Sequence, residues 1–506
     1  MDSFRYFPLG APFPESPHAV ISSLPTMADV RGYEEHEPRV VEAMASGYPR
    51  FVVHTYIRQL VDFYCAREGL AGCFGVLIPN RRAAQDCVSF LGEGVTASKV
   101  ADALFLVSVD AAEEALAYRL RKYVQHTGCG ISSRQAEDIL VSYGKLECAF
   151  AEESYFGAPL PEAERLIAEQ VGCRTEDVLV CASGMNAFYA GYRAVQEFQS
   201  SRGRKRWLQL GWLYLDSSSV LKEFLHTDET LECIYDVFDL DAVKERIRSY
   251  GDELSAVVVE VPTNPLIQVC ELQAIADLVR EQGGVMIVDP TIASIYNVDV
   301  LPFTDLLVSS LTKYAATEGD VMIGALAVNK ESPYYGDLVL RISAFYQPPY
   351  SRDLARLVYE MENAPVLVAQ MNDNAARLRR FLNDHPKVER VDYALSSEQF
   401  ANVAKSEHSG GAVISIVLKD EIDSFYDSIQ LMKGPSFGAR FTLLCPFVYL
   451  AHYDLVICEE GRAFLASVGV DPELIRISVG TEPYEEIEAV FAAALDVLNY
   501  EGAGTT

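Results

Sequence analysis

Residues 306–324 read LLVSSLTKYAATEGDVMIG, and this stretch decides the expected fold. An apolar run ends there in small hydroxyl residues, and Lys313 follows them. Upstream, residues 285–291 read VMIVDPT, a second apolar run that ends in Asp289. Runs without polar alternation are typical of strands in a parallel sheet covered by helices on both faces. The sequence therefore predicts an α/β protein with a lysine and an acid at the ends of two buried strands.

A lysine, an acid and hydroxyl groups in this arrangement suit pyridoxal phosphate (PLP). The lysine can bind the cofactor covalently, the acid can pair with the pyridine nitrogen, and the hydroxyls can hold the phosphate. A lone Ser-x-Thr-Lys is weak evidence, because most such lysines are solvated surface residues. The order of further segments along the chain decides whether Lys313 is a PLP-binding lysine or a solvated surface residue.

Six segments resemble, in order, the motifs of the Cys/Met-metabolism PLP enzymes, the family of cystathionine γ-synthase, cystathionine lyases and homoserine sulfhydrylases. That family has S-G-M, a stacking tyrosine, E-x-P-T-N-P, V-D-x-T, S-x-T-K-Y and, nearer the C-terminus, R-x-S-x-G. The matching positions here are 183–185, Tyr214, 260–265, 288–291, 310–314 and 476–480. The chain is identified by this resemblance as a member of the family.

The resemblance implies a set of cofactor-binding residues. Lys313 would carry PLP and then move protons as general acid and base. Asp289 would keep the pyridine nitrogen protonated. Tyr214 would stack on the ring, although Leu215-Asp216 departs from the family's usual Tyr-Gly-Gly-Thr, and a purely structural aromatic is the rival interpretation. The remaining implied contacts are the amides of Gly184 and Met185 at a helix N-terminus, the hydroxyls of Ser310 and Thr312, and Asn264 near the 3′-oxygen.

On the substrate side, the resemblance implies that Arg476 binds the α-carboxylate in a two-pronged fork. Ser436 in Pro-Ser-Phe-Gly resembles the family's Ser-Leu-Gly, which assists at the same carboxylate. One family feature is absent: the Tyr-x-Arg pair that a neighbouring subunit gives to the phosphate. Arg134 and the tripeptide 48–50 (Tyr-Pro-Arg) are both candidates to replace it, and the sequence does not choose between them.

Bulk properties narrow the class of partner and the compartment. The formal net charge is −30 (42 basic and 72 acidic residues), which argues against nucleic acid and anionic membranes as partners. The eleven cysteines include no closely spaced pairs, which favours a reduced cytoplasmic chain and no metal site. No apolar run approaches the roughly 20 residues of a membrane span, and the first 30 residues do not resemble a targeting peptide.

Patterning predicts three parts: an N-terminal arm with an α/β extension (1–150), a PLP-binding large domain (151–340) and a small C-terminal domain (341–506). The arm, about residues 1–50, is expected to be irregular and to pack through its aromatics. In the extension we predict helices over 51–67, 81–91 and 111–125 and strands over 75–78 and 103–109. The family resemblance implies a fold type I PLP-dependent transferase (aspartate aminotransferase-like), with a mostly parallel sheet in the large domain and a smaller α+β C-terminal domain.

The N-terminal region resembles that of long, fungal-type cystathionine γ-synthases. This implies γ-replacement, in which an O-acylhomoserine and L-cysteine give L-cystathionine, as in transsulfuration and methionine biosynthesis. Sulfhydrylase and γ- or β-lyase activities remain alternatives, because nothing in the sequence selects the nucleophile. A non-catalytic binding or regulatory protein on a PLP fold is the alternative of another class. Family members build each site from two subunits, which implies a homodimer or homotetramer.

Overall fold

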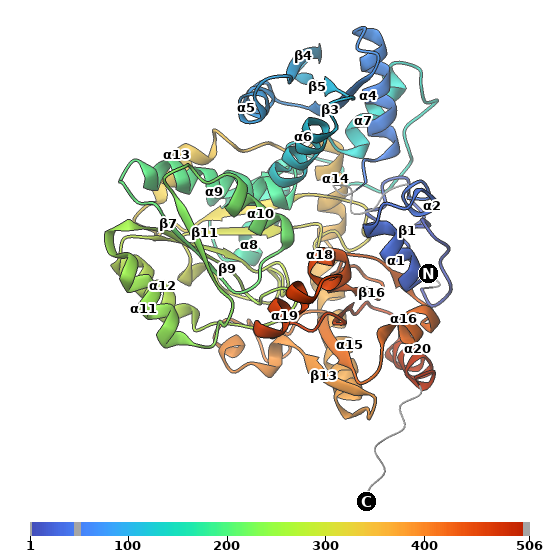
Figure 1. The fold of residues 1–506 in the computed structure, drawn as a ribbon, viewed down its shortest axis with the longest axis vertical. Coiled ribbons are helices and arrows are strands. Elements are labelled where there is room, and N and C mark those ends of the chain that lie inside the picture. The colour runs from blue at the N-terminus through green and yellow to red at the C-terminus, as the bar shows by residue number, and fades with distance from the viewer. Residues whose placement is uncertain (1–2, 45–51, 499–506) are drawn as a thin grey trace, which may run out of the picture.

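The computed structural model, which describes residues 3–44 and 52–498, is built around a seven-stranded sheet (Figure 1). The strand order is β6-β12-β11-β10-β9-β7-β8. As the apolar runs predict, the sheet is mostly parallel, and only β12 runs antiparallel to its neighbours β11 and β6. The strands are β6 (Val178–Cys181), β7 (Arg206–Leu210), β8 (Thr230–Ile234), β9 (Leu254–Glu260), β10 (Val285–Asp289), β11 (Leu306–Ser310) and β12 (Gly324–Val328).

Both faces of this sheet are buried, which explains the absence of polar alternation in its strands. In β9, Val257 and Val259 belong to one hydrophobic core, and Ala256 and Val258 belong to another on the opposite face. The parallel strands β9, β10 and β11 end at one edge of the sheet, so the residues that follow them come together there. The covering helices are α8 (Pro159–Val171), α9 (Gly184–Ser200), α10 (Leu215–Glu223), α11 (Leu240–Tyr250), α12 (Leu272–Glu281) and α13 (Tyr335–Ile342).

The C-terminal part contains a second, five-stranded sheet of order β13-β14-β17-β16-β15, in which only the short β15 pairs in parallel. Long helices cover it, and β17 carries Arg476 towards the large sheet. The elements are β13 (Val388–Asp392), β14 (Val413–Leu418), β15 (Met432–Lys433), β16 (Leu443–Pro446), β17 (Ile475–Ser478), α14 (Ser351–Met361), α15 (Ala364–Asp384), α16 (Ile422–Ser428), α17 (Phe447–Ala451), α18 (Tyr453–Val456), α19 (Glu459–Ser467) and α20 (Tyr484–Asp496).

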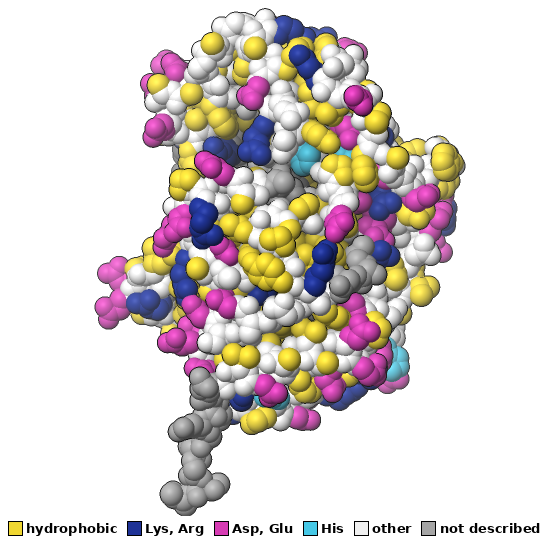
Figure 2. Space-filling view, turned by 90° about the vertical axis from the view of Figure 1, so that its right-hand side faces the viewer, with side chains coloured by type: hydrophobic (Ala, Val, Ile, Leu, Met, Phe, Trp, Pro, Cys, Tyr) yellow, Lys and Arg dark blue, Asp and Glu magenta, His cyan; other side chains and the backbone are white. Residues whose placement is uncertain are grey.

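The extension is a separate lobe, seen at the top of Figures 1 and 2. A three-stranded antiparallel sheet of order β3-β5-β4 packs with four helices. The predicted helices and strands are present, with ends shifted by at most four residues, while β4 was not predicted because its burial is partial. The elements are α4 (Thr55–Arg67), β3 (Cys73–Ile78), α5 (Arg81–Leu91), β4 (Thr96–Ala101), β5 (Leu104–Asp110), α6 (Glu114–Thr127) and α7 (Ser133–Ser142).

The N-terminal arm is more regular than the sequence predicts. It forms β1 (Pro12–Phe13), β2 (Ile21–Ser22), the eight-residue helix α1 (Met27–Glu34) and the short α2 (Pro38–Val41). Thr26 begins α1 by accepting a hydrogen bond from the Asp29 amide, a capping signal overlooked among the prolines and glycines. The arm packs as expected through its aromatics, because the rings of Phe13 and Phe441 meet edge-on with centroids 4.4 Å apart.

A buried ion network joins the extension to the large domain. Arg134 on α7, only 1 % exposed, lies 2.6 Å from Glu152, 3.2 Å from Asp353 and 3.5 Å from Asp320. Arg356 also contacts Asp320, at 3.1 Å. Opposite charges therefore compensate one another where the two parts of the chain meet. We refer to these five residues as the buried ion network.

Within the described residues, no helix combines the length and apolarity that a membrane span requires.

Candidate active site

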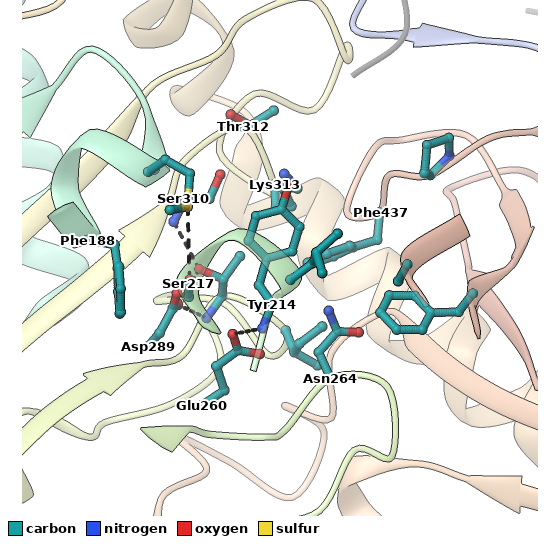
Figure 3. A pocket seen from close by; sticks show the side chains of 18 of the residues that line it. Phe188, Tyr214, Ser217, Glu260, Asn264, Asp289, Ser310, Thr312, Lys313 and Phe437 are labelled. Atoms are coloured by element: carbon teal, nitrogen blue, oxygen red, sulfur yellow. Dashed lines mark hydrogen bonds between the residues drawn. The ribbon is translucent and has the colours of Figure 1, made fainter. Parts of the chain in front are cut away.

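The side chains at the carboxyl edge of the large sheet line one pocket, which residues of the C-terminal sheet close from the other side (Figure 3). The predicted site residues found in its wall come from six separate segments of the chain. They are Gly184, Met185, Tyr214, Asn264, Asp289, Ser310, Thr312, Lys313 and Arg476.

The N-terminus of α9 forms one end of the pocket. Ser183 caps this 17-residue helix by accepting from the Asn186 amide at 3.0 Å, which leaves the Gly184 and Met185 amides at the helix start. A Cβ on Gly184 would lie 2.7 Å from the Ser310 Cβ, so only glycine permits this close approach of helix and strand. Amides at a helix N-terminus, with Ser310 and Thr312 beside them, form a cradle suited to a phosphate.

Two carboxylates meet at the ends of adjacent strands. Glu260 ends β9 and Asp289 ends β10, and the two residues are register partners in the parallel pair. Burial raises the pKa of Asp289 to about 6, against the opposing effect of Thr291, which donates to its Oδ1. Burial and the nearby Asp289 charge raise the pKa of Glu260 well above its usual range. A buried acid in this state is suited to a cationic partner, such as a protonated pyridine nitrogen.

Lys313 is buried at the centre of the pocket. Burial first, and the positive charge of Arg476 second, hold the pKa of its amine well below the usual range. Its Nζ lies 5.5 Å from the centroid of the Phe437 ring. A lysine amine with a lowered pKa is more readily available as a nucleophile towards an aldehyde and as a base.

The side chain of Arg476 is held in a fixed orientation. Its Nη1 donates to Asn264 Oδ1 at 3.0 Å, and its guanidinium lies 4.9 Å and 4.7 Å from the ring centroids of Phe437 and Phe447. Ser436 contributes its backbone carbonyl, which accepts from Arg476 Nη2 at 3.5 Å. Its neighbours Pro435 and Phe437 line the pocket, whereas the structure does not bring the Ser436 side chain there.

Tyr214 is anchored at both ends, and Figure 3 shows its ring in the middle of the labelled side chains. Its amide donates to Glu260 Oε1 at 2.5 Å, and its hydroxyl donates to Asp216 Oδ2 at 3.0 Å. The Leu215-Asp216 departure from the family pattern therefore has a definite structural role, because Asp216 fixes the hydroxyl.

The two candidates for the missing phosphate arginine have different outcomes. Arg134 is engaged with carboxylates in the buried ion network and does not line the pocket. The tripeptide 48–50 lies outside the described residues. Arg134 is therefore a structural cation.

Sequence reasoning named Glu260 only as part of a motif and missed it as a pocket residue. The sequence contains a signal for this role, because an acid ends each of the two apolar runs that form β9 and β10. Phe437 and Phe447 were also missed as the aromatic neighbours of Arg476, since their approach depends on how the two sheets pack.

These residues fit PLP. The glycine-dependent cradle suits its phosphate, the buried acid suits its pyridine nitrogen, and the buried amine suits its aldehyde. Within residues 3–44 and 52–498, no group of three or more His, Cys, Asp or Glu is arranged to hold a metal ion.

Comparison with known proteins agrees with this chemistry. Residues 163–496 match the family described as Cys/Met metabolism PLP-dependent enzyme. The L-2-amino-4-chloropent-4-enoate dechlorinase/desaturase of Streptantibioticus cattleyicolor is 34 % identical, over 96 % of this chain and 97 % of that protein. The cystathionine γ-synthase of Neurospora crassa is 28 % identical, over 97 % of this chain and 98 % of that protein.

Among solved structures, a cystathionine γ-synthase from Xanthomonas oryzae pv. oryzae has a TM-score of 0.57 at 20 % identity. The match covers 67 % of this chain and 86 % of that one. This likeness concerns the fold alone.

Proposed function

Since the chain belongs to the Cys/Met metabolism PLP-dependent enzymes, we propose that it removes a leaving group from the γ-carbon of an L-amino acid. The observation that carries the proposal is the convergence of Lys313, Asp289 and Arg476 in one buried pocket. A non-catalytic role would not require a buried lysine with a lowered pKa beside a buried acid.

Bound PLP supplies an electron sink for carbanions next to the amino group. We assign Asp289 to the pyridine nitrogen, and the Gly184 and Met185 amides with Ser310 and Thr312 to the phosphate. Asn264 is assigned to the neighbourhood of the cofactor's 3′-oxygen, and its contact with Arg476 couples that position to the substrate side.

The remaining steps fall to this chain's own side chains. Arg476 holds the α-carboxylate, and its fixed guanidinium orients the substrate before reaction. The Lys313 amine, whose pKa burial lowers, takes protons from the α- and β-carbons and returns them. Tyr214 covers the reacting centre, and the apolar walls around Phe437 and Phe447 limit the access of water.

For the fate of the γ-carbon, we propose replacement: an O-acylhomoserine and L-cysteine give L-cystathionine, as in transsulfuration and methionine biosynthesis. The similarity to the Neurospora crassa enzyme over nearly the whole chain supports this proposal, because it includes the extension. The proposal includes a homodimer or homotetramer and a reduced cytoplasmic setting, the latter supported by eleven free cysteines.

Elimination without a nucleophile is the second candidate. The name of the 34 % identical relative places its chlorine on C4, the γ-carbon of an amino acid. In the described pocket, the basic side chains of this chain are Lys313 and Arg476, which leaves no further cation here for the carboxylate of a second amino acid. Both observations favour a small apolar γ-substituent and no second substrate.

One assay separates the candidates. The enzyme receives O-acetyl- or O-succinylhomoserine with cysteine, with sulfide or with neither, or a γ-chlorinated amino acid alone, and mass spectrometry identifies the products. Cystathionine supports replacement with cysteine, and homocysteine indicates a sulfhydrylase. Loss of chloride, or 2-oxobutyrate without a thiol, supports elimination. No reaction at the γ-carbon of any of these compounds contradicts the proposal.

A further inference from the structure

The carboxylate of Asp216 is buried between the active-site pocket and the extension. Its side chain is 1 % exposed, and its neighbours Leu215 and Ser217 line the pocket. Asp216 itself lines a groove on the other side of α10, together with Tyr118, Lys122 and His126 of α6. Burying a carboxylate costs free energy unless the group is paired or hydrogen-bonded. The partners of Asp216 therefore indicate its role.

Two partners of Asp216 lie on opposite sides of it. Oδ2 accepts from the Tyr214 hydroxyl at 3.0 Å, on the pocket side. Oδ1 accepts from Gln125 Nε2 at 2.8 Å, on the side of the extension. Asp216 therefore connects the active-site tyrosine directly to a side chain of α6.

The position of Gln125 is itself determined by its neighbours. It is 4 % exposed, and its Oε1 accepts from Lys122 Nζ at 3.2 Å, which turns the amide nitrogen towards Asp216. Next to it, His126 Nδ1 lies 3.0 Å from Glu223 Oε2, and its Nε2 lies 3.8 Å from Asp216 Oδ1. Helices α6 and α10 are thus joined by side-chain contacts at both ends of α10.

We propose that Gln125 of the extension is a positioning residue, which holds the Tyr214 hydroxyl in place through the buried Asp216 carboxylate. The extension is then part of the active site. This inference rests on the proposed function only in that Tyr214 acts beside the bound cofactor. It does not depend on which nucleophile, if any, completes the reaction.

The same segment of the extension also supports the phosphate cradle. Ser183, the residue that caps α9, donates to the Gly128 carbonyl at 3.3 Å. A Cβ on Gly128, whose φ is +61°, would lie 2.6 Å from the Asn186 amide nitrogen. Residues 125–128 therefore contact both the tyrosine anchor and the start of the helix that forms the cradle.

A double-mutant cycle tests the proposal. Gln125→Met retains the bulk of the side chain and removes the donor, and it is made both in the parent and in Tyr214→Phe. Gln135→Met, the same change on α7 of the extension, is the matched control. Each holoenzyme is assayed for deuterium exchange at the α-carbon of L-methionine in D2O, a reaction that requires no γ-leaving group. The visible circular dichroism of the bound cofactor and the melting temperature are recorded in parallel.

We expect Gln125→Met to lower kcat for exchange by about tenfold with KM nearly unchanged, because a displaced group slows the chemical step more than binding. In Tyr214→Phe the same change should have almost no further effect on kcat or on the dichroism band. The control should match its parent in both backgrounds.

An equal loss in both backgrounds would show that Gln125 acts through the fold and not through Tyr214, and would overturn the proposal. Unchanged kcat and dichroism in Gln125→Met would overturn it as well. If the cycle holds but no γ-carbon reaction is found with any substrate, the positioning role stands and the proposed function fails.

Discussion

Replacing Arg134 by methionine should destabilise the whole protein without weakening the active site directly. Arg134 compensates Glu152, Asp320 and Asp353 and also donates to the Asp320 carbonyl at 2.8 Å. Removing one partner of a buried ion pair costs about 3–5 kcal/mol, because the acid that loses its cation, here Asp353, stays buried without compensation. We expect a loss of that size in the free energy of unfolding of Arg134→Met.

The loss should depend on pH in a defined direction. Burial raises the pKa of Asp353, and Arg134 opposes that rise. Without Arg134 the native state favours the protonated form of Asp353. The native state then binds more protons than the unfolded chain, so the stability of the variant falls as the pH rises. The difference between variant and parent should therefore be larger at pH 8 than at pH 5.

Urea unfolding measures the loss of stability. The transition is monitored by the fluorescence of Trp207 and Trp212, which are both buried in the large domain. Arg165→Met is the control, because Arg165 is 52 % exposed and pairs with Glu162 and Glu169 on the surface of α8, where loss of a pair costs less than about 1 kcal/mol. Adding Asp353→Asn to Arg134→Met should restore part of the stability. If Arg134→Met unfolds at the parental urea concentration but loses the cofactor, Arg134 contributes to phosphate binding and our reasoning is wrong.

Three further predictions concern the site and the N-terminal arm. Lys313→Ala should lack both activity and the cofactor adduct that borohydride traps, whereas the exposed Lys330→Ala should retain both; trapping on another lysine would contradict this assignment. Asp289→Asn should lower kcat by orders of magnitude, because a neutral pyridine stabilises a carbanion poorly, and near-normal turnover would show that the acid is misassigned. Burial lowers the pKa of His18 to about 2, although its Nε2 lies 3.3 Å from the Glu137 carboxylate; below about pH 6.5 the unfolded chain therefore binds a proton more readily than the native state, and stability falls as the pH is lowered. The urea midpoint of His18→Gln should fall less steeply with pH than that of the parent, and equal slopes would refute the role of His18.

Much of the fold follows from the sequence, because buried parallel strands and amphipathic helices have distinct patterns. The family, the fold class, the cofactor and the enzyme class predicted from the motifs are confirmed by the comparisons. The motifs succeed because they encode backbone requirements, such as the glycine at 184, where a Cβ would collide with Ser310. The roles of the individual site residues stay predictions.

Contacts between distant segments could not be predicted from the sequence. Gln125 and Asp216 are 91 positions apart, Gln125 stands in no family motif and Asp216 stands where the chain departs from one, so only the packing of α6 on α10 brings them together. Arg134 stood as one of two candidates for the phosphate because a cation in a polar segment gives no sign of its partners. In the structure its partners include Asp320 and Asp353, which lie in other parts of the chain.

The buried ion network also constrains the order of evolutionary steps. Asp320 shortly precedes β12 of the large sheet and Asp353 lies on α14, while Arg134 between them comes from the extension. A descendant that lost the extension in one deletion would keep Arg356 beside Asp320 but would inherit Asp353 without the Arg134 cation. Asp353 would first have to mutate to a neutral residue, and that mutation lowers the benefit of keeping Arg134. Whether the extension can be lost thus depends on positions far outside it, and a chimaera made with a shorter relative has to exchange residues 134, 152, 320, 353 and 356 together.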